Sequence, residues 1–167
     1  MVTRPEPAGT RPIVHWYDGL DIHSNLALAE PILQQSSEAG IRAVRISFAT
    51  LYGKVRQRKG WRWYDPTPEQ RLEITRGLVD LAASLGLTLY SCSQSDLTLA
   101  GALPSHCIDG DLLSSLYPLH LPAATGKDPG QRPECGCTPS VDIGSYLMSC
   151  PNGCRYCYAN PRIETKL

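Results

Sequence analysis

Hydrophobic and polar positions follow two different periods in the first part of the chain. Residues 13–17 and 41–48 are short, largely apolar runs typical of strands. Between them, residues 25–39 carry apolar side chains at helical spacing, and Gly40 follows as a stop signal. Pro31 lies inside this segment and is unfavourable in a helix interior. The pattern therefore predicts a strand, a helix and a second strand.

The next segment carries a clearer helix signal. Thr67 can cap a helix, Pro68 suits its first turn, and Gln70 can complete a capping box. Apolar residues recur at helical spacing as far as Gly86, and residues 87–92 then read as a strand. A shorter helix is expected from residue 109, as N-cap, through residue 117. Residues 118–133 are rich in Pro and Gly and are expected to have no regular structure.

Alternating strands and helices predict an α/β fold with parallel strands. Three such units cannot close an eight-stranded barrel. We therefore expect a partial (βα)-barrel or an open parallel sheet, followed by an irregular Cys-rich cluster-binding segment. The expected parts are a flexible lead-in (1–11), an α/β region (12–117), and a Pro/Gly-rich loop with a Cys-rich iron–sulfur segment (118–167). Because an unclosed sheet leaves an edge to be covered, an incomplete chain is also expected.

Composition narrows the function classes. The 167 residues are 42% hydrophobic and 19% charged, which is typical of an ordinary globular domain. The formal net charge is zero, so no global charge attracts nucleic acid or an anionic membrane. No apolar run approaches the roughly 20 residues that span a bilayer. The 7 cysteines are odd in number and no apolar signal-peptide core precedes them, which indicates reduced thiols in the cytoplasm.

Three of the cysteines are closely spaced near the C-terminus. Cys150, Cys154 and Cys157 form a C-x3-C-x2-C pattern. Three thiolates in such a loop can bind three irons of a [4Fe–4S] cluster and leave the fourth iron open. One alternative is a structural zinc site that takes its fourth ligand from Cys135 or Cys137, and another is a set of disulfides.

The same spacing resembles that of the radical S-adenosylmethionine (SAM) enzymes. In that superfamily the open iron binds the amino and carboxylate groups of SAM, and one electron cleaves the sulfonium to give a 5′-deoxyadenosyl radical. The residue before the third cysteine is usually aromatic and lies beside the adenine, and here it is Tyr156. The resemblance implies a SAM-dependent enzyme with an unknown substrate.

The remaining four cysteines form a second candidate site. They are Cys92, Cys107, Cys135 and Cys137. Four thiolates can bind a second, fully ligated [4Fe–4S] cluster that relays an electron to the first. A tetrathiolate zinc site is an alternative, and so are buried cysteines that act as small hydrophobic residues. His106, beside Cys107, is the only histidine near these positions.

Several short motifs together resemble a bacterial domain-of-unknown-function family whose members end in a radical-SAM-like cysteine motif. The resemblance extends from about residue 12 to residue 160 and covers the C-terminal part of the family only. It implies a truncated gene, a minimal variant, or a split protein in which a partner chain supplies the missing N-terminal half. The final Cys-x-Tyr-Cys-Tyr-Ala is also similar to the cluster loop of the spore photoproduct lyases, which act on DNA. The motifs are Cys107-Ile108-Asp109, Glu134-Cys135-Gly136-Cys137, residues 140–144 and residues 150–160.

Two further functions remain open. Residues 52–64 interleave Lys and Arg with Trp61 and Trp63, a combination that nucleic-acid grooves use. A solvated loop carries the same residues, and the zero net charge favours that interpretation. The chain could also be a non-catalytic, metal-stapled fragment that docks on a partner chain. Weaker polar candidates are Asp18, Ser47 and Asp142.

Overall fold

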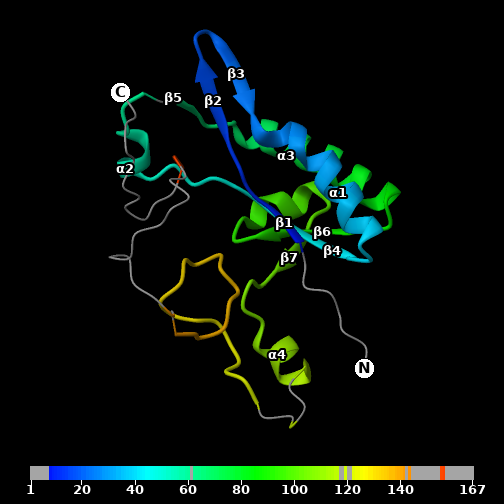
Figure 1. Cartoon of the computed structure of the whole chain (residues 1–167). Coiled ribbons are helices and arrows are strands. Elements are labelled where there is room, and N and C mark those ends of the chain that lie inside the picture. Colours follow the sequence, from blue (N-terminus) through cyan, green and yellow to red (C-terminus); the bar gives the residue numbers. More distant parts are fainter. Residues whose placement is uncertain are drawn as a thin grey trace.

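Two small sheets organise the chain, and the computed structural model describes residues 8–60, 62–116, 119, 122–141, 143, 155 and 156. The larger sheet has four parallel strands in the order β1-β4-β6-β7, which confirms the predicted α/β fold with an open parallel sheet (Figure 1). The smaller sheet is antiparallel, in the order β3-β2-β5. The strands are β1 (Ala8–Ile13), β2 (His15–Asp18), β3 (Asp21–Ser24), β4 (Ala43–Phe48), β5 (Arg62–Tyr64), β6 (Thr88–Cys92) and β7 (Leu103–Ser105).

Helices connect the parallel strands. Helix α1 follows the β2–β3 hairpin and precedes β4, and helix α3 lies between β5 and β6. Both pack on the same face of the parallel sheet, as Figure 1 shows. The helical segments are η1 (Asn25–Leu28), α1 (Ala29–Glu38), α2 (Gly53–Arg56), α3 (Pro68–Ser84), η2 (Ser95–Ala100) and α4 (Gly110–Leu116).

These elements correct three expectations about the N-terminal part. Residues 8–11, expected in the flexible lead-in, belong to β1, because this segment gains ladder hydrogen bonds from the parallel edge of β4. The strand expected at residues 13–17 is divided between β1 and β2, which belong to different sheets. The helix expected at 25–39 begins as a 3₁₀ turn. Pro31 then falls in the first turn of α1, where a missing N–H costs no intrahelical hydrogen bond.

Helix α3 begins at the predicted capping box. The backbone N–H of Gln70 donates to Thr67 Oγ1 at 3.3 Å, and the backbone N–H of Thr67 donates to Gln70 Oε1 at 2.9 Å. Pro68 occupies the first turn. These bonds satisfy two groups that a helix start otherwise leaves to water. At the other end, Gly86 takes a φ of 69°, as the predicted residue after the helix.

Thr67→Ala is expected to lower the free energy of unfolding by about 1 kcal/mol, because it removes the cap acceptor for Gln70 N. Thr67→Ser keeps a hydroxyl at the same position and is the matched control, with an expected change of a few tenths of a kcal/mol. Urea unfolding followed by circular dichroism measures both. Equal losses in the two variants would show that the hydroxyl is not the stabilising group.

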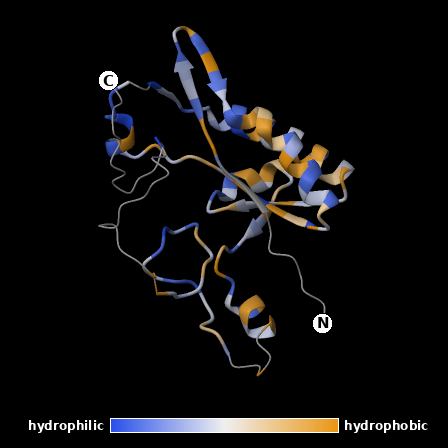
Figure 2. Ribbon diagram, in the orientation of Figure 1, coloured by the Kyte–Doolittle hydropathy of each residue, from blue (hydrophilic) through white to orange (hydrophobic). Residues whose placement is uncertain are grey.

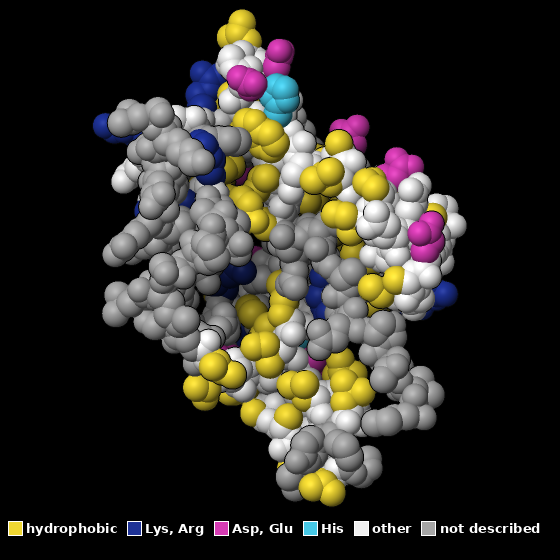
Figure 3. Space-filling model, viewed as in Figure 1, with side chains coloured by type: hydrophobic (Ala, Val, Ile, Leu, Met, Phe, Trp, Pro, Cys, Tyr) yellow, Lys and Arg dark blue, Asp and Glu magenta, His cyan; other side chains and the backbone are white. Residues whose placement is uncertain are grey.

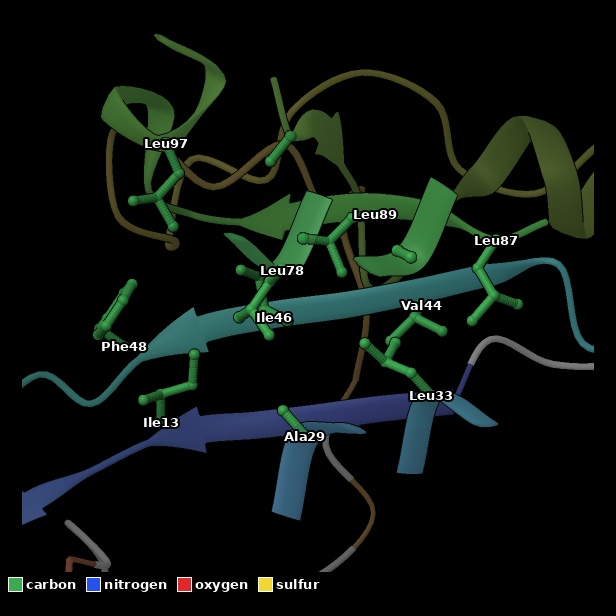
Figure 4. Close-up of a cluster of buried hydrophobic side chains, with 12 residues drawn as sticks. Ile13, Ala29, Leu33, Val44, Ile46, Phe48, Leu78, Leu87, Leu89 and Leu97 are labelled. Carbon is green, nitrogen blue, oxygen red and sulfur yellow. The ribbon is translucent and has the colours of Figure 1, made fainter. Parts of the chain in front are cut away.

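The hydrophobic core lies between α1, α3 and the parallel sheet. Figure 4 shows Leu33 of α1 and Leu78 of α3 directed toward Val44 and Ile46 of β4. Val44 is fully buried, and Leu33 and Ile46 are each 1% exposed. In Figure 2 the apolar positions recur along both helices and along the strands beneath them. This core covers one face of the parallel sheet.

Candidate metal centre

Cys92 and Cys107 meet at the carboxyl edge of the parallel sheet. Cys92 is the last residue of β6, where it pairs with Ser105 of β7, and Cys107 follows β7 by two residues. Neighbouring parallel strands end at the same edge, so residues just beyond their ends approach each other. The two Sγ atoms are 2.9 Å apart. Cys92 thus ends the strand predicted at residues 87–92, and Cys107 lies just beyond β7, a strand that the sequence did not predict.

The Cys-Gly-Cys segment lies against the same loop. Cys137 Sγ accepts hydrogen bonds from the backbone N–H groups of Cys107 at 3.2 Å and Ile108 at 3.3 Å. The backbone N–H of Thr138 in turn donates to the carbonyl oxygen of Ile108 at 3.0 Å. Glu134 accepts a further bond from the backbone N–H of Ser95, just beyond Cys92 in the chain. Four cysteines from three separate segments are thus brought to one edge of the sheet.

The four thiols differ in exposure, and burial affects the pKa of Cys135. Cys135 and Cys137 are buried, Cys92 is half-buried and Cys107 is exposed. Burial is the main cause that raises the pKa of Cys135, and the neighbouring thiols of Cys137 and Cys107 raise it further, although a backbone hydrogen bond from Cys137 lowers it. A metal must therefore displace the Cys135 proton, so metal uptake at this thiol releases a proton.

The four cysteine side chains are suitable metal ligands, but Cys92 Sγ and Cys107 Sγ are closer together than two thiolates on one metal ion. Across the described part of the chain, no group of three or more His, Cys, Asp or Glu side chains is arranged to hold a metal ion. Two thiolates about 2.3 Å from a tetrahedral zinc lie roughly 3.8 Å apart, so Cys92 and Cys107 would have to separate by nearly 1 Å. Backbone N–H groups that point at sulfur, as at Cys137, stabilise a ligating thiolate. The donor set fits either tetrathiolate zinc or an iron–sulfur cluster.

His106 lies beside the Cys-Gly-Cys segment. Among the described residues it belongs to no group of three or more side chains that could hold a metal ion. Its ring packs against Gly136, where an added Cβ would be 2.8 Å from His106 Nε2 and Cδ2. The absence of a side chain at Gly136 therefore lets the ring approach the backbone between Cys135 and Cys137. No sequence pattern predicts this contact beyond the position of His106 next to Cys107.

The C-x3-C-x2-C cysteines lie outside the described residues, as does Asp142. Within that motif the structure describes Arg155 and Tyr156, which form a turn with Tyr156 half-buried. The carbonyl oxygen of Arg155 accepts a hydrogen bond of 2.5 Å from Arg58 Nη1. Arg58 lies two residues after α2, which follows the carboxyl end of β4. The described residues of the motif are thus tied to the segment beyond β4.

The cationic run is engaged mainly within the protein. It was expected as a loop, but it contains α2 and β5. Arg56 pairs with Asp65 at 2.7 Å, and the guanidinium of Arg62 lies 4.0 Å from the centre of the Tyr17 ring. In Figure 3, Lys and Arg side chains gather over α2 and β5, whereas acidic side chains gather over the β2–β3 hairpin and α1. The nucleic-acid interpretation stays a prediction.

Two other predicted polar residues are separated by the structure. Asp18 is exposed at the end of β2, in the antiparallel sheet, and Ser47 is half-buried in β4. A residue that the sequence did not single out is Gln94, whose side chain accepts from Phe48 N at 2.7 Å and donates to Phe48 O at 3.3 Å. This bridge ties the loop after Cys92 to the end of β4. A glutamine in a loop has no sequence signal for such a role.

His15 is a buried histidine that the sequence pattern did not single out. It is 7% exposed, stacks on Phe48 and meets Tyr64 edge-on. Burial lowers the pKa of His15, Arg71 lowers it further, and Asp65 raises it to a lesser degree. The imidazole is therefore neutral at pH 7. It belongs to an aromatic cluster at the carboxyl end of β1 and β4, on the side where β2 and β5 begin.

Gly110 holds the Cys-rich segment against α4. An added Cβ there would overlap the carbonyl oxygen of Ala124 and lie 3.1 Å from Thr138 Cγ2, one residue beyond Cys137. Gly110→Ala is therefore expected to lower the free energy of unfolding by about 1–3 kcal/mol. Gly77→Ala on the exposed side of α3 has nothing within 4 Å and is the matched control, with a gain of about 1 kcal/mol. Chemical denaturation compares the two. A neutral or stabilising Gly110→Ala would mean that the backbone of Ala124 does not approach this residue.

Comparison with known proteins identifies the family. No helix among the described residues is long and apolar enough to cross a bilayer. No curated protein and no solved structure matches the chain. The sequence model of one family, described as Domain of unknown function (DUF1848), matches residues 10–159. This confirms the resemblance to a domain-of-unknown-function family. Because this match covers most of the sequence, the chain belongs to the DUF1848 family.

Proposed function

We propose that this chain is an iron–sulfur protein of the radical-SAM type. Cys150, Cys154 and Cys157 would hold a [4Fe–4S] cluster with an open iron for SAM, and Tyr156 would line the adenine. A cluster of this kind supplies one electron to SAM when both are bound. The work of the chain's own residues is to hold these groups and to exclude water from the reacting atoms.

The observation that best supports this proposal is the meeting of four other thiols at one edge of the sheet. Cys92 and Cys107 approach each other there, and Cys137 Sγ receives two backbone N–H groups from the same loop. We propose that these three, with Cys135, hold a second [4Fe–4S] cluster that passes electrons toward the first. The carboxyl edge of an open parallel sheet is also where α/β folds bind their ligands. Such thiolate sites fit a reducing cytoplasm, which we propose as the location.

Arg58 supports the position of the SAM-binding loop. Its hydrogen bond to the carbonyl oxygen of Arg155 ties the residue between Cys154 and Tyr156 to the segment that follows β4. The four gathered thiols lie at the carboxyl ends of β6 and β7, the next two strands of the same sheet. One edge of one sheet can therefore carry both thiolate sets, which is the arrangement that electron transfer between them requires.

A non-catalytic, zinc-stapled fragment is the competing function, because four converging cysteines are also a zinc ligand set. Metal content separates the two. After anaerobic purification we expect about eight irons and as many sulfides per chain for two cubane clusters, and about four for one cluster. Iron and zinc are counted by plasma mass spectrometry and sulfide by a colorimetric assay. Zinc at one per chain, without iron after reconstitution with iron and sulfide, would contradict the proposal.

A further inference from the structure

The parallel sheet has two chemically different faces. Val44, Ile46 and Phe48 of β4 belong to the core beneath α1 and α3. Side chains alternate along a strand, so Arg45 and Ser47 lie on the opposite face. On β6 the same alternation leaves Tyr90 and Cys92 on that second face, with Leu89 in the core. The second face therefore carries an arginine, a phenol and one of the cysteines.

Arg45 is a cation on this face that has no ion pair among the described residues. Arg45 as a whole is half-buried, and its Nε atom is buried with no hydrogen-bond partner among the described residues. Within the described part of the chain, the Arg45 side chain has no ion pair and no hydrogen bond, whereas Arg56 and Arg71 both pair with Asp65. A guanidinium does not lose its proton in a protein, so Arg45 cannot escape the cost of desolvation by becoming neutral. An anion or another hydrogen-bond acceptor at the guanidinium would offset that cost.

The strand neighbours of Arg45 are a glycine and a residue that adds a hydrogen-bond donor. Arg45 pairs with Tyr90 on β6 and with Gly9 on β1. Gly9 carries no side chain, while Tyr90 adds a phenolic O–H on the same face. Cys92 is two residues beyond Tyr90, which is about 7 Å along the strand. A ligand held at Arg45 therefore reaches the edge where the four thiols gather.

From this arrangement we infer that Arg45, with Tyr90, binds an oxyanion group of the substrate, a carboxylate or a phosphate. The fork of N–H groups on a guanidinium matches two oxygens of either group, and Tyr90 donates to a further oxygen. The inference deepens the proposed function and rests on it for the nature of the neighbouring metal site. It assigns the substrate class: a small anionic molecule that lies along the face carrying Arg45 and Tyr90, with its reacting part toward the carboxyl edge.

Anion binding to the anaerobically purified protein tests this inference. Inorganic phosphate and acetate are titrated separately in a zwitterionic buffer free of other anions, and the melting temperature is followed. For the wild-type chain we expect one of the two anions to raise the melting temperature in a saturable way, which also separates a phosphate site from a carboxylate site. Arg45→Gln should weaken that binding at least tenfold, and Arg45→Lys should weaken it less, because it keeps the charge but loses the fork. Arg76→Gln, on the exposed side of α3, is the matched control and should bind as the wild type does.

Two results would overturn the inference: binding of neither anion by the wild type, or equal binding by Arg45→Gln and the wild type. If Arg45→Gln does not fold, phenylglyoxal labelling of the wild type decides instead. Phosphate or acetate should then protect Arg45, and not Arg76, and equal labelling of Arg45 with and without anion would overturn the site. The iron content of Arg45→Gln should equal that of the wild type, so failure of the anion site is distinguishable from failure of the proposed clusters.

Discussion

Cys154→Ala is expected to remove about four of about eight irons per chain and to abolish any spectral response to SAM. Cys135→Ala is expected to remove the other four irons and to leave that response in place. The two thiols belong to different proposed ligand sets, and only the C-x3-C-x2-C set leaves an iron open. Iron and sulfide analysis of anaerobically reconstituted variants, with electron paramagnetic resonance (EPR), measures both effects.

Ser140→Ala is the control for these cysteine variants. Ser140 is exposed and lies between the two cysteine sets in the sequence, so its loss should leave both iron counts unchanged. Far-ultraviolet circular dichroism checks that each variant keeps its fold. If Cys154→Ala and Cys135→Ala each removed all of the iron, the chain would hold a single shared site, and the assignment of two ligand sets would be wrong.

Leu33→Ala is expected to lower the free energy of unfolding by about 2–5 kcal/mol. Leu33 is 1% exposed and packs from α1 onto the parallel sheet, so its truncation removes buried apolar contacts and leaves a cavity. A loss of this size is a large share of the stability of a typical domain. Urea denaturation of the metal-free chain, followed by circular dichroism, gives the value.

Leu28→Ala is the matched control, because Leu28 is 57% exposed and lies at the end of η1, just before α1. Its expected effect is within about 0.5 kcal/mol. Equal losses for Leu28→Ala and Leu33→Ala would contradict the packing of α1 on the sheet. Loss of far-ultraviolet signal in Leu33→Ala without denaturant would instead place its effect at or above the whole stability of the metal-free chain.

Local signals in the sequence were sufficient for helices α1, α3 and α4 and for the inner strands. The Thr67 capping box predicts the start of α3 because its hydrogen bonds span only three residues. Asp109 was expected as an N-cap, and its Oδ1 accepts from Leu112 N at 3.0 Å at the start of α4. Strands β4 and β6 are short apolar runs between predicted helices, and such runs form parallel neighbours.

Edge strands and the antiparallel sheet could not be predicted in the same way. Strand β1 begins with Ala8, Gly9 and Thr10, and β7 contains Pro104, so neither has a strand-like pattern of its own. Both exist because a neighbouring strand offers a ladder of hydrogen bonds. Hairpin β2–β3 and strand β5 depend likewise on pairing across the chain, which local periodicity does not report.

The candidate site divides along the same line. Cys92, Cys107, Cys135 and Cys137 were grouped because they remain outside the C-x3-C-x2-C motif. The ends of β6 and β7 explain why Cys92 and Cys107 meet. The bridge from Gln94 to Phe48 and the buried Nε of Arg45 had no sequence signal. An arginine in a strand has the same sequence appearance whether it faces water, a carboxylate or an empty face of the sheet. Only the packing distinguishes these cases.

The most direct measurement of the central claim is EPR of the dithionite-reduced protein, recorded with and without SAM. If a [4Fe–4S] cluster with an open iron is present, we expect a reduced-cluster signal whose g-values or intensity change when SAM is added. Cys154→Ala should lack this change and serves as the control. A wild-type signal that is identical with and without SAM, in protein that carries its full iron, would contradict the radical-SAM function proposed for this chain.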